Sequence, residues 1–149
     1  MQDTIGPVVP LPDLLCASVV RDGANIVATV KASVAVPDAN RPEFYFYADG
    51  VTPISTPAGY GLFPCTSWLD MRTISGGFHG QGVYDCVATQ NVVASVSTAT
   101  PAAGTFVYTF AAAPAGLSGG FSWRAAMEGA CSYIDTVPDR TAPPAHIAC

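Results

Sequence analysis

Charged side chains are scarce in this chain of 149 residues: they make up 11 % of it, against roughly a quarter in ordinary globular proteins. Lys31 is the only lysine, and the formal net charge at pH 7 is −5. Nucleic acids and anionic membranes favour basic protein surfaces, so neither is an expected partner. Solubility must come instead from Ser, Thr, Asn, Gln and nine aspartates.

Long hydrophobic runs are also missing, so we expect no membrane span. No residue between Cys86 and Trp123 carries a formal charge, but Pro101, Pro114, four glycines and many hydroxyl and amide side chains interrupt that stretch. A transmembrane helix needs about 20 predominantly apolar residues. The first three residues lack the basic and apolar character of a secretion signal. We therefore expect a mature extracellular protein, secreted or displayed at the cell surface, from which that signal has been removed.

The five cysteines contain no Cys-x-x-Cys pair, and neither histidine stands at zinc-ligand spacing, so we expect no metal cluster. In an oxidising compartment, five cysteines suit two disulfides and one leftover thiol. We predict Cys65–Cys86, which would close a loop beside a strand, and Cys131–Cys149, because a terminal cysteine can tether a chain end. Cys16 would then be a buried thiol or an intermolecular partner. Other pairings stay open, because spacing alone does not fix connectivity.

Helical periodicity is absent, whereas period-two alternation recurs. Phe106, Tyr108 and Phe110 alternate with Thr and Val, while Phe121 and Trp123 alternate with Ser and Arg. Successive strand side chains point to opposite sides, so this pattern predicts sheets with one buried face. About nine strands separated by turn residues predict an all-β sandwich or barrel. We favour a two-sheet antiparallel β-sandwich with these five rings sealed between its sheets.

The chain divides into an extended N-terminal arm (1–13), a β-sandwich domain (14–140) and a C-terminal tail (141–149). Three prolines in the arm argue against a central strand there. The Asp22-Gly23 dipeptide is a strong hairpin signal between the first two strands. The predicted strands are, in chain order, 14–20, 25–34, 43–48, 68–75, 83–89, 92–98, 105–110, 121–128 and 131–135.

Aromatic residues near two loops give the best indication of a binding site. Residues 50–67 are rich in Pro, Gly and Thr and are long for a loop inside a compact domain. Exposed aromatic rings stack on sugars or anchor protein contacts. The predicted ligand-binding residues, beside this loop and the glycine-rich turn 76–82, are Tyr60, Phe63, Trp68, Phe78 and Tyr84. A loop folded over a small second core explains the same aromatics at least as well.

Catalytic candidates are few, and we predict that the protein is not an enzyme. Nucleophilic catalysis needs a base within hydrogen-bond reach of the nucleophile. Only His79, in the glycine-rich turn, and His146, in the proline-rich tail, supply an imidazole. Both are explained more simply as exposed loop residues.

Pairs of carboxylates give no stronger indication of catalysis than the two histidines do. Glycoside hydrolysis needs two acids facing one groove. Glu43 and Glu128 are the only glutamates, each at a strand end or on an outward face. Asp70 and Asp85 lie on neighbouring predicted strands and could meet, although solvated aspartates on strand faces are more common.

Calcium is a possible cofactor. Ca²⁺ takes six to eight oxygens, often from aspartates and loop carbonyls. Aspartate also favours turns for its own local hydrogen bonding, so we assign no metal ligand. The aspartates at predicted strand ends or turns are Asp13, Asp22, Asp38, Asp49, Asp135 and Asp139.

Several short sequence motifs follow one another along the chain. They are Asp13-Leu14-Leu15, Asp22-Gly23, the Phe106–Phe110 strand, Pro114-Ala115-Gly116-Leu117, Phe121-Ser122-Trp123-Arg124 and Asp135-Thr136-Val137-Pro138-Asp139. Their order resembles secreted β-sandwich modules of the DOMON type and family-nine carbohydrate-binding modules, over about residues 13–140. The resemblance implies an extracellular sandwich that binds sugars, haem or calcium.

The chain departs from these families in two respects. Met71, Met127 and His79 do not form an evident haem-ligand pair, and no rich acidic cluster follows Tyr47. The type of ligand therefore cannot be transferred from the resemblance.

The sequence supports two hypotheses for the function. A third hypothesis, an enzyme that depends on His79, is weaker. The favoured one is a secreted, non-catalytic binding module with a glycan or cell-surface partner, carbohydrate being the favoured ligand. The alternative is a structural or self-assembling cell-surface protein that forms homo-oligomers through its N-terminal arm. The apolar arm, the low charge and the odd cysteine motivate this alternative.

Overall fold

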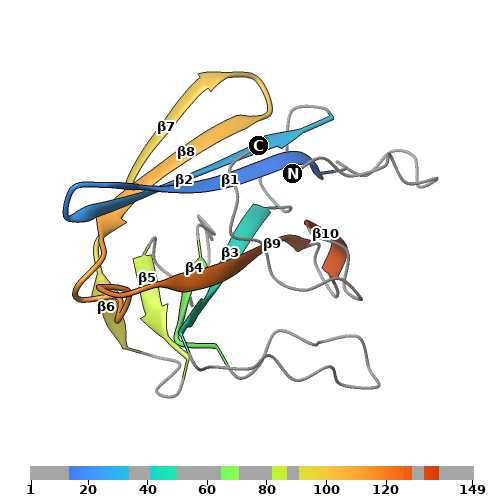
Figure 1. Cartoon of the computed structure of the whole chain (residues 1–149). Coiled ribbons are helices and arrows are strands. Elements are labelled where there is room, and N and C mark those ends of the chain that lie inside the picture. The colour runs from blue at the N-terminus through green and yellow to red at the C-terminus, as the bar shows by residue number, and fades with distance from the viewer. Residues whose placement is uncertain are drawn as a thin grey trace.

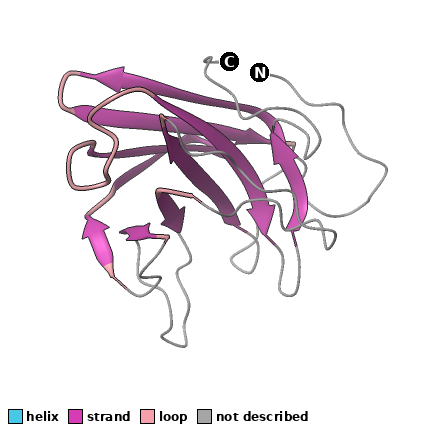
Figure 2. Cartoon of the chain, turned by 60° about the horizontal axis from the view of Figure 1, so that its bottom comes forward, coloured by secondary structure: helices cyan, strands magenta, loops and turns pink. Residues whose placement is uncertain are grey.

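The computed structural model describes residues 14–33, 41–49, 65–70, 82–86, 91–128 and 133–137. These residues form two antiparallel sheets stacked face to face (Figure 1). The described residues contain strands, turns and loops and no helix (Figure 2). The predicted all-β, two-sheet antiparallel sandwich is confirmed. The predicted arm (1–13) and tail (141–149) lie outside the described residues, and within the described ranges no helix is long and apolar enough to span a membrane.

The first sheet has four strands in the spatial order β1-β2-β8-β7. Its strands are β1 (Leu14–Asp22), β2 (Asn25–Ala32), β8 (Thr105–Ala111) and β7 (Ser97–Ala102). β1 and β2 form a hairpin, and Gly23 in its turn has a φ of 58°. Glycine adopts this left-handed backbone at no steric cost, and the predicted Asp-Gly turn is confirmed.

The second sheet has six strands in the order β10-β9-β3-β4-β5-β6. Its strands are β10 (Tyr133–Val137), β9 (Phe121–Glu128), β3 (Arg41–Ala48), β4 (Ser67–Asp70), β5 (Gly82–Asp85) and β6 (Val92–Ala94). β3 lies between β9 and β4. A central strand is buried on both faces, which explains why four consecutive residues of β3 are aromatic.

The prediction of one strand over 92–98 is wrong, because this segment forms parts of two strands in different sheets. β6 lies at the edge of the six-stranded sheet and β7 at the edge of the four-stranded sheet. Ser95 and Val96 carry the chain from one layer to the other.

A second connection between the layers runs from β8 to β9 through residues 112–120. The predicted turn at Pro114–Leu117 lies here, and Gly116 has a φ of 72°. Gly116 N donates a hydrogen bond to Ala113 O at 3.0 Å, and Leu117 N donates to Ala112 O at 3.0 Å. The turn thereby directs Leu117 inward, where its side chain is fully buried.

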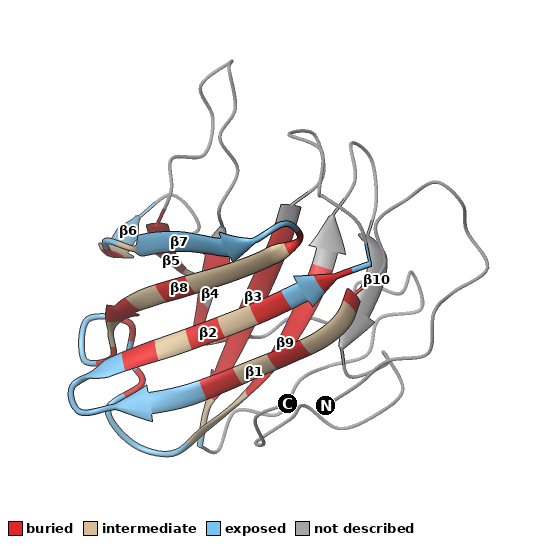
Figure 3. Ribbon diagram, turned by 90° about the horizontal axis from the view of Figure 1, so that it is seen from above, coloured by how far each residue is buried: buried red, intermediate tan, exposed pale blue. Residues whose placement is uncertain are grey.

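The core lies between the sheets, as the alternating pattern predicts. Buried and less buried positions alternate along β2 and β8 (Figure 3). Tyr108, Phe110 and Trp123 are at most 2 % exposed, while Phe106 and Phe121 are partly buried and pack against the same cluster. The prediction that these five rings face the interior is confirmed, with Phe106 and Phe121 at the margin of the core.

Two phenylalanines of β3 join the core rings of both sheets. The Phe44 ring centroid lies 6.1 Å from that of Tyr108 and 6.0 Å from that of Trp123. Phe46 meets Phe110 edge to face, with centroids 5.4 Å apart. Burying each ring stabilises the fold by about 2 kcal/mol, and such pairs add about 1 kcal/mol beyond burial.

The cysteine pairing is confirmed in one part and wrong in another. Cys65 and Cys86 form the predicted disulfide, with Cα atoms 5.6 Å apart. Cys16 is disulfide-bonded as well, so it is not the leftover thiol. The other two cysteines, Cys131 and Cys149, lie outside the described residues. Because Cys16 must bond to one of them, the predicted Cys131–Cys149 pair is wrong. Sequence spacing alone could not show this.

Candidate functional site

The outer face of the six-stranded sheet carries an unusual set of side chains. Along β3 the sequence Glu-Phe-Tyr-Phe-Tyr alternates, so that Phe44 and Phe46 face the core while Glu43, Tyr45 and Tyr47 face away from it. Tyrosines and a disulfide form a second group of buried residues, separate from the core. We call this group, together with Glu43 and Arg124, the outer-face cluster: Tyr45, Tyr47, Cys65, Tyr84, Cys86, Ala126, Glu43 and Arg124.

Three aromatic residues stand in one row across β3, β4 and β5. Tyr45 is the register partner of Trp68, and Trp68 is the register partner of Tyr84. Directly opposed residues share a face, with Cβ atoms about 5 Å apart. Tyr45 is 1 % exposed and Tyr84 is 4 % exposed. The backbone of Trp68 therefore lies between two buried tyrosines.

Two residues of opposite charge are buried on the same face. Glu43 is 1 % exposed and Arg124 is 3 % exposed. In the β3–β9 register, Arg124 lies opposite Tyr45 and Glu43 lies opposite Ala126, so Glu43 and Arg124 are diagonal neighbours. Burying a charge is costly unless an opposite charge or a hydrogen bond compensates for it. The register places these two residues of opposite charge on adjacent strands of the same face.

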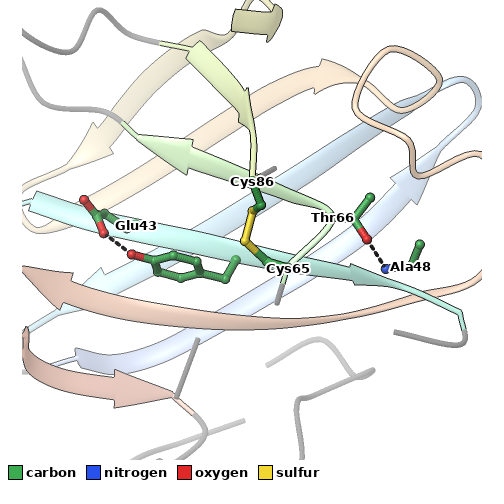
Figure 4. The surroundings of a disulfide bond; sticks show 6 residues. Glu43, Ala48, Cys65, Thr66 and Cys86 are labelled. Atoms are coloured by element: carbon green, nitrogen blue, oxygen red, sulfur yellow. Dashed lines mark hydrogen bonds between the residues drawn. A yellow bond between two sulfur atoms is a disulfide. The ribbon is translucent and has the colours of Figure 1, made fainter. Parts of the chain in front are cut away.

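A hydrogen bond links Glu43 to Tyr45 of the aromatic row. The Tyr45 hydroxyl donates to Glu43 Oε2 at 2.7 Å, within the buried cluster (dashed line at Glu43 in Figure 4). Hydrogen bonds to ionised carboxylates are shorter and stronger than those between neutral groups. The bond fixes the orientation of the Glu43 carboxylate on the sheet.

The Cys65–Cys86 disulfide and Thr66 hold this side of the sheet together (Figure 4). The Ala48 amide donates to Thr66 Oγ1 at 2.9 Å, and the Thr66 amide donates to Phe46 O at 2.8 Å. These bonds fix the start of β4 against β3, while the disulfide links it to the end of β5. The position of Trp68, two residues after Thr66, is thereby set by rigid elements.

The structure describes two of the five predicted ligand-binding residues. Trp68 of β4 and Tyr84 of β5 are register partners, and the Tyr84 side chain is buried in the outer-face cluster, whereas for Trp68 only the backbone is described. Tyr60, Phe63 and Phe78 lie outside the described residues.

Sequence reasoning assigned Glu43, Tyr45, Tyr47 and Arg124 of the outer-face cluster to no site, although a signal for them was present. Glu43, Tyr45 and Tyr47 stand two residues apart in the sequence, which places one acid and two phenols on one face of a strand. Glu43 does face outward as expected, but it is buried. Arg124 alternates with Trp123 and Ala125 and therefore had to face away from the core.

The carboxylates considered for hydrolysis do not meet. Asp70 lies opposite Gly82, and Asp85 lies opposite Ser67, at the two ends of the β4–β5 pair. The two aspartates also fall on opposite faces by strand alternation. His79 and His146 lie outside the described residues.

Calcium binding stays a prediction. Among the residues that the structure describes, no group of three or more His, Cys, Asp or Glu side chains is placed to hold a metal ion. Asp22 and Asp49 are exposed at strand ends. Asp13, Asp38 and Asp139 are not among the described residues, and for Asp135 only the backbone in β10 is described.

No protein-family model matches the chain, and neither a curated protein nor a solved structure gives a significant match. The resemblance to DOMON domains and family-nine carbohydrate-binding modules therefore stays a prediction.

Proposed function

We propose that the protein is a secreted, non-catalytic binding module that takes carbohydrate on the outer face of the six-stranded sheet, around Trp68. The observation that carries the proposal is the register of Tyr45, Trp68 and Tyr84 across three strands, with Glu43 and Arg124 on the same face. Aromatic faces stack on the C–H faces of sugar rings. A few fixed polar groups beside an apolar surface then provide orientation and specificity.

In this proposal some residues contact the ligand and others support the residues that do. Tyr45 and Tyr84 are buried, so they support the row rather than contact a ligand in this structure. Trp68 is the ring we assign to sugar stacking, with Tyr60, Phe63 and Phe78 as the further predicted contacts. Because the disulfide and the bonds of Thr66 fix β4, little conformational entropy is lost when Trp68 is engaged.

An extracellular location is part of the proposal. Disulfides persist in oxidising compartments, and both Cys65–Cys86 and the bond at Cys16 support that location. The resemblance to secreted sugar-binding sandwiches supports the choice of carbohydrate. Calcium is retained as an optional cofactor to be supplied in the test.

A glycan array, probed with and without calcium, tests the proposal. We expect the wild-type protein to bind a defined set of glycans, and Trp68→Ala to lower the affinity at least about tenfold, as is typical of aromatic residues that dominate a binding site. Trp68→Phe, which keeps a ring, should retain part of the binding. Val92→Ala, at an exposed position on β6 of the same sheet, is the matched control and should bind normally.

Thermal melts of each variant separate lost binding from lost folding. A silent array under both conditions, or full binding by a folded Trp68→Ala variant, would contradict carbohydrate binding at this face.

A second candidate is a structural or self-assembling cell-surface protein. The observation that favours it is the four-stranded sheet, whose outer face is free of charged residues between its two ends. Its edge strand β7 is exposed along its whole length. The N-terminal arm, which sequence reasoning assigned to assembly, lies outside the described residues.

A further inference from the structure

The edge strand β7 exposes every one of its residues. All 6 residues of Ser97–Ala102 are exposed, whereas every residue of the neighbouring strand β8 is buried or half-buried. Figure 3 shows β7 in pale blue along its length, at the edge of the four-stranded sheet. β2 and β8 separate it from β1, which carries the disulfide-bonded Cys16. The side chains of β7 are therefore open to a large partner.

Hydroxyl side chains gather on this strand and directly before it. Among the described residues, the exposed serines and threonines are Ser33, Ser95, Ser97, Thr98, Thr100 and Ser118. Most of these lie within the segment 95–103, which reads Ser-Val-Ser-Thr-Ala-Thr-Pro-Ala-Ala and carries no charge. This part of the surface presents neutral hydroxyl groups beside a proline.

The backbone distinguishes Thr100 from the other exposed hydroxyl residues. The β7–β8 register shifts between Ala99 and Ala102, so Thr100 and Pro101 have no register partner in β8. A bulge of this kind leaves its extra residue out of the ladder. Proline also holds the residue before it in an extended conformation. Thr100 is thus an exposed threonine in an extended segment that the register does not pair with β8.

We propose that Thr100 is the acceptor of an O-linked sugar, which an external glycosyltransferase transfers from a nucleotide-activated sugar. Thr100 Oγ1 forms a bond to the anomeric carbon of the sugar. The bond between that carbon and the phosphate oxygen breaks, and a nucleoside diphosphate leaves. The hydroxyl proton passes to a base of the transferase, and nothing is oxidised or reduced. The protein contributes the hydroxyl group and the exposed, extended segment that presents it.

The sequence favours an O-linked sugar over other modifications. Segments rich in Ser and Thr that contain Pro are typical of O-glycosylated proteins. The chain has no Asn-x-Ser or Asn-x-Thr sequence, so it offers no acceptor for an N-linked glycan. Kinases select their substrates partly by patterns of charge, and no charged residue lies between Cys86 and Trp123.

A sugar at Thr100 compensates for the scarcity of charge. Charged residues make up 11 % of the chain, and glycans are bulky, solubilising surface groups. β7 belongs to the four-stranded sheet, whereas the proposed ligand-binding face belongs to the six-stranded one. The inference rests on the extracellular location in the proposed function and does not depend on carbohydrate binding.

Transfer of sugar to the folded, disulfide-bonded protein in vitro tests the proposal. The probe is UDP-N-acetylgalactosamine with a polypeptide N-acetylgalactosaminyltransferase, and fragmentation mass spectrometry locates the sugar. We expect it on Thr100. Thr100→Ala should remove the label at this position, and Thr100→Ser should keep it. Pro101→Ala should lower the yield severalfold, because the extended conformation is no longer favoured. The control Ser118→Ala, at an exposed serine outside this segment, should not change labelling of Thr100.

A synthetic peptide of residues 95–103 and thermal melts of each variant complete the experiment. A labelled peptide with an unlabelled Thr100 in the folded protein would overturn the proposal, because the fold then withholds this hydroxyl. An unlabelled peptide would also overturn it, since the sequence is then no acceptor. Equal labelling of Ser33 or Ser118 would refute the selectivity for Thr100.

Solubility tests the role of the sugar. The modified protein should remain in solution at a higher concentration than the unmodified protein, and equal solubility would overturn the solubilising role. Neither the labelling nor the solubility bears on the glycan array, which measures ligand binding by the unmodified protein.

Discussion

The Arg21 guanidinium of β1 lies 5.6 Å from the centre of the Phe121 ring of β9, and so joins the two sheets of the sandwich. Arg21 Nη2 also donates hydrogen bonds to Leu117 O and, at 2.8 Å, to Gly119 O. Arg21 thereby links β1 to the 112–120 connection, which is about a hundred residues away in the sequence and crosses between the two layers.

Replacing Arg21 tests the importance of this junction. Arg21→Ala removes a cation–π contact and two hydrogen bonds to backbone carbonyls, and we expect a loss of about 1–2 kcal/mol in the free energy of unfolding. Arg21→Lys keeps the charge but not the fork of donors, so its loss should be intermediate. Urea denaturation measures both. Equal stability of Arg21→Ala and the wild type would show that the junction contributes nothing.

Gly120 and Asp49 form a second junction, between the end of β3 and the start of β9. The Asp49 amide donates to Gly120 O at 3.0 Å, and a Cβ added at Gly120 would lie 2.8 Å from Asp49 Cγ. Gly120→Ala should therefore destabilise the protein by at most about 1 kcal/mol, because the exposed Asp49 side chain must move aside. Asp49→Ala removes the clashing atoms, so Gly120→Ala should cost much less in that background. Additive effects in thermal melts would refute the predicted clash.

The Tyr45–Glu43 hydrogen bond should stabilise the outer-face cluster. Tyr45→Phe removes the donor to a buried carboxylate, and we expect a loss of about 1–3 kcal/mol. Glu43→Gln removes the negative charge, so Tyr45→Phe should cost less in the Glu43→Gln background. A double-mutant cycle measured by chemical denaturation gives the coupling. Zero coupling would indicate that the bond does not contribute to stability.

The Cys65–Cys86 disulfide leads to one prediction for the free energy of unfolding and one for the peptides that stay linked after digestion. Cys65 and Cys86 are 21 residues apart, and closing a loop of that size stabilises a protein by about 3 kcal/mol. The double variant Cys65→Ser, Cys86→Ser should lose about that amount. Non-reducing peptide mapping should recover Cys65 linked to Cys86, and Cys16 linked to a peptide containing Cys131 or Cys149. A peptide with an alkylated Cys16 would contradict this pairing.

Alternation predicted the strands and the core because it reports directly on which face of a strand is buried. Phe106–Phe110 and Phe121–Trp123 lie where the pattern placed them, and the Asp-Gly turn joins β1 to β2. The crossing at Ser95-Val96 was missed, since Val92, Val93 and Val96 favour a single strand and no Gly or Pro marks the change of sheet.

The outer-face cluster depended on information that a local pattern does not hold. Tyr45 and Tyr47 fall in the predicted strand 43–48, but the burial of Glu43 beside them depends on how distant segments pack. Trp68 was singled out from the sequence, whereas its register with Tyr45 and Tyr84 follows from long-range strand pairing. The bond at Cys16 likewise could not be read from the spacing of the cysteines.

The two tryptophans provide the most direct test of sugar binding at the outer face. Trp123 is buried in the core at 1 % exposure, whereas the backbone of Trp68 pairs with that of Tyr45 in the β3–β4 register. Fluorine NMR of protein labelled with fluorotryptophan gives one resonance for each, assigned with Trp68→Phe. On titration with a glycan from the array, we expect the Trp68 resonance to shift in a saturable manner while the Trp123 resonance stays in place. Saturable binding that leaves the Trp68 resonance unmoved would contradict the proposed site.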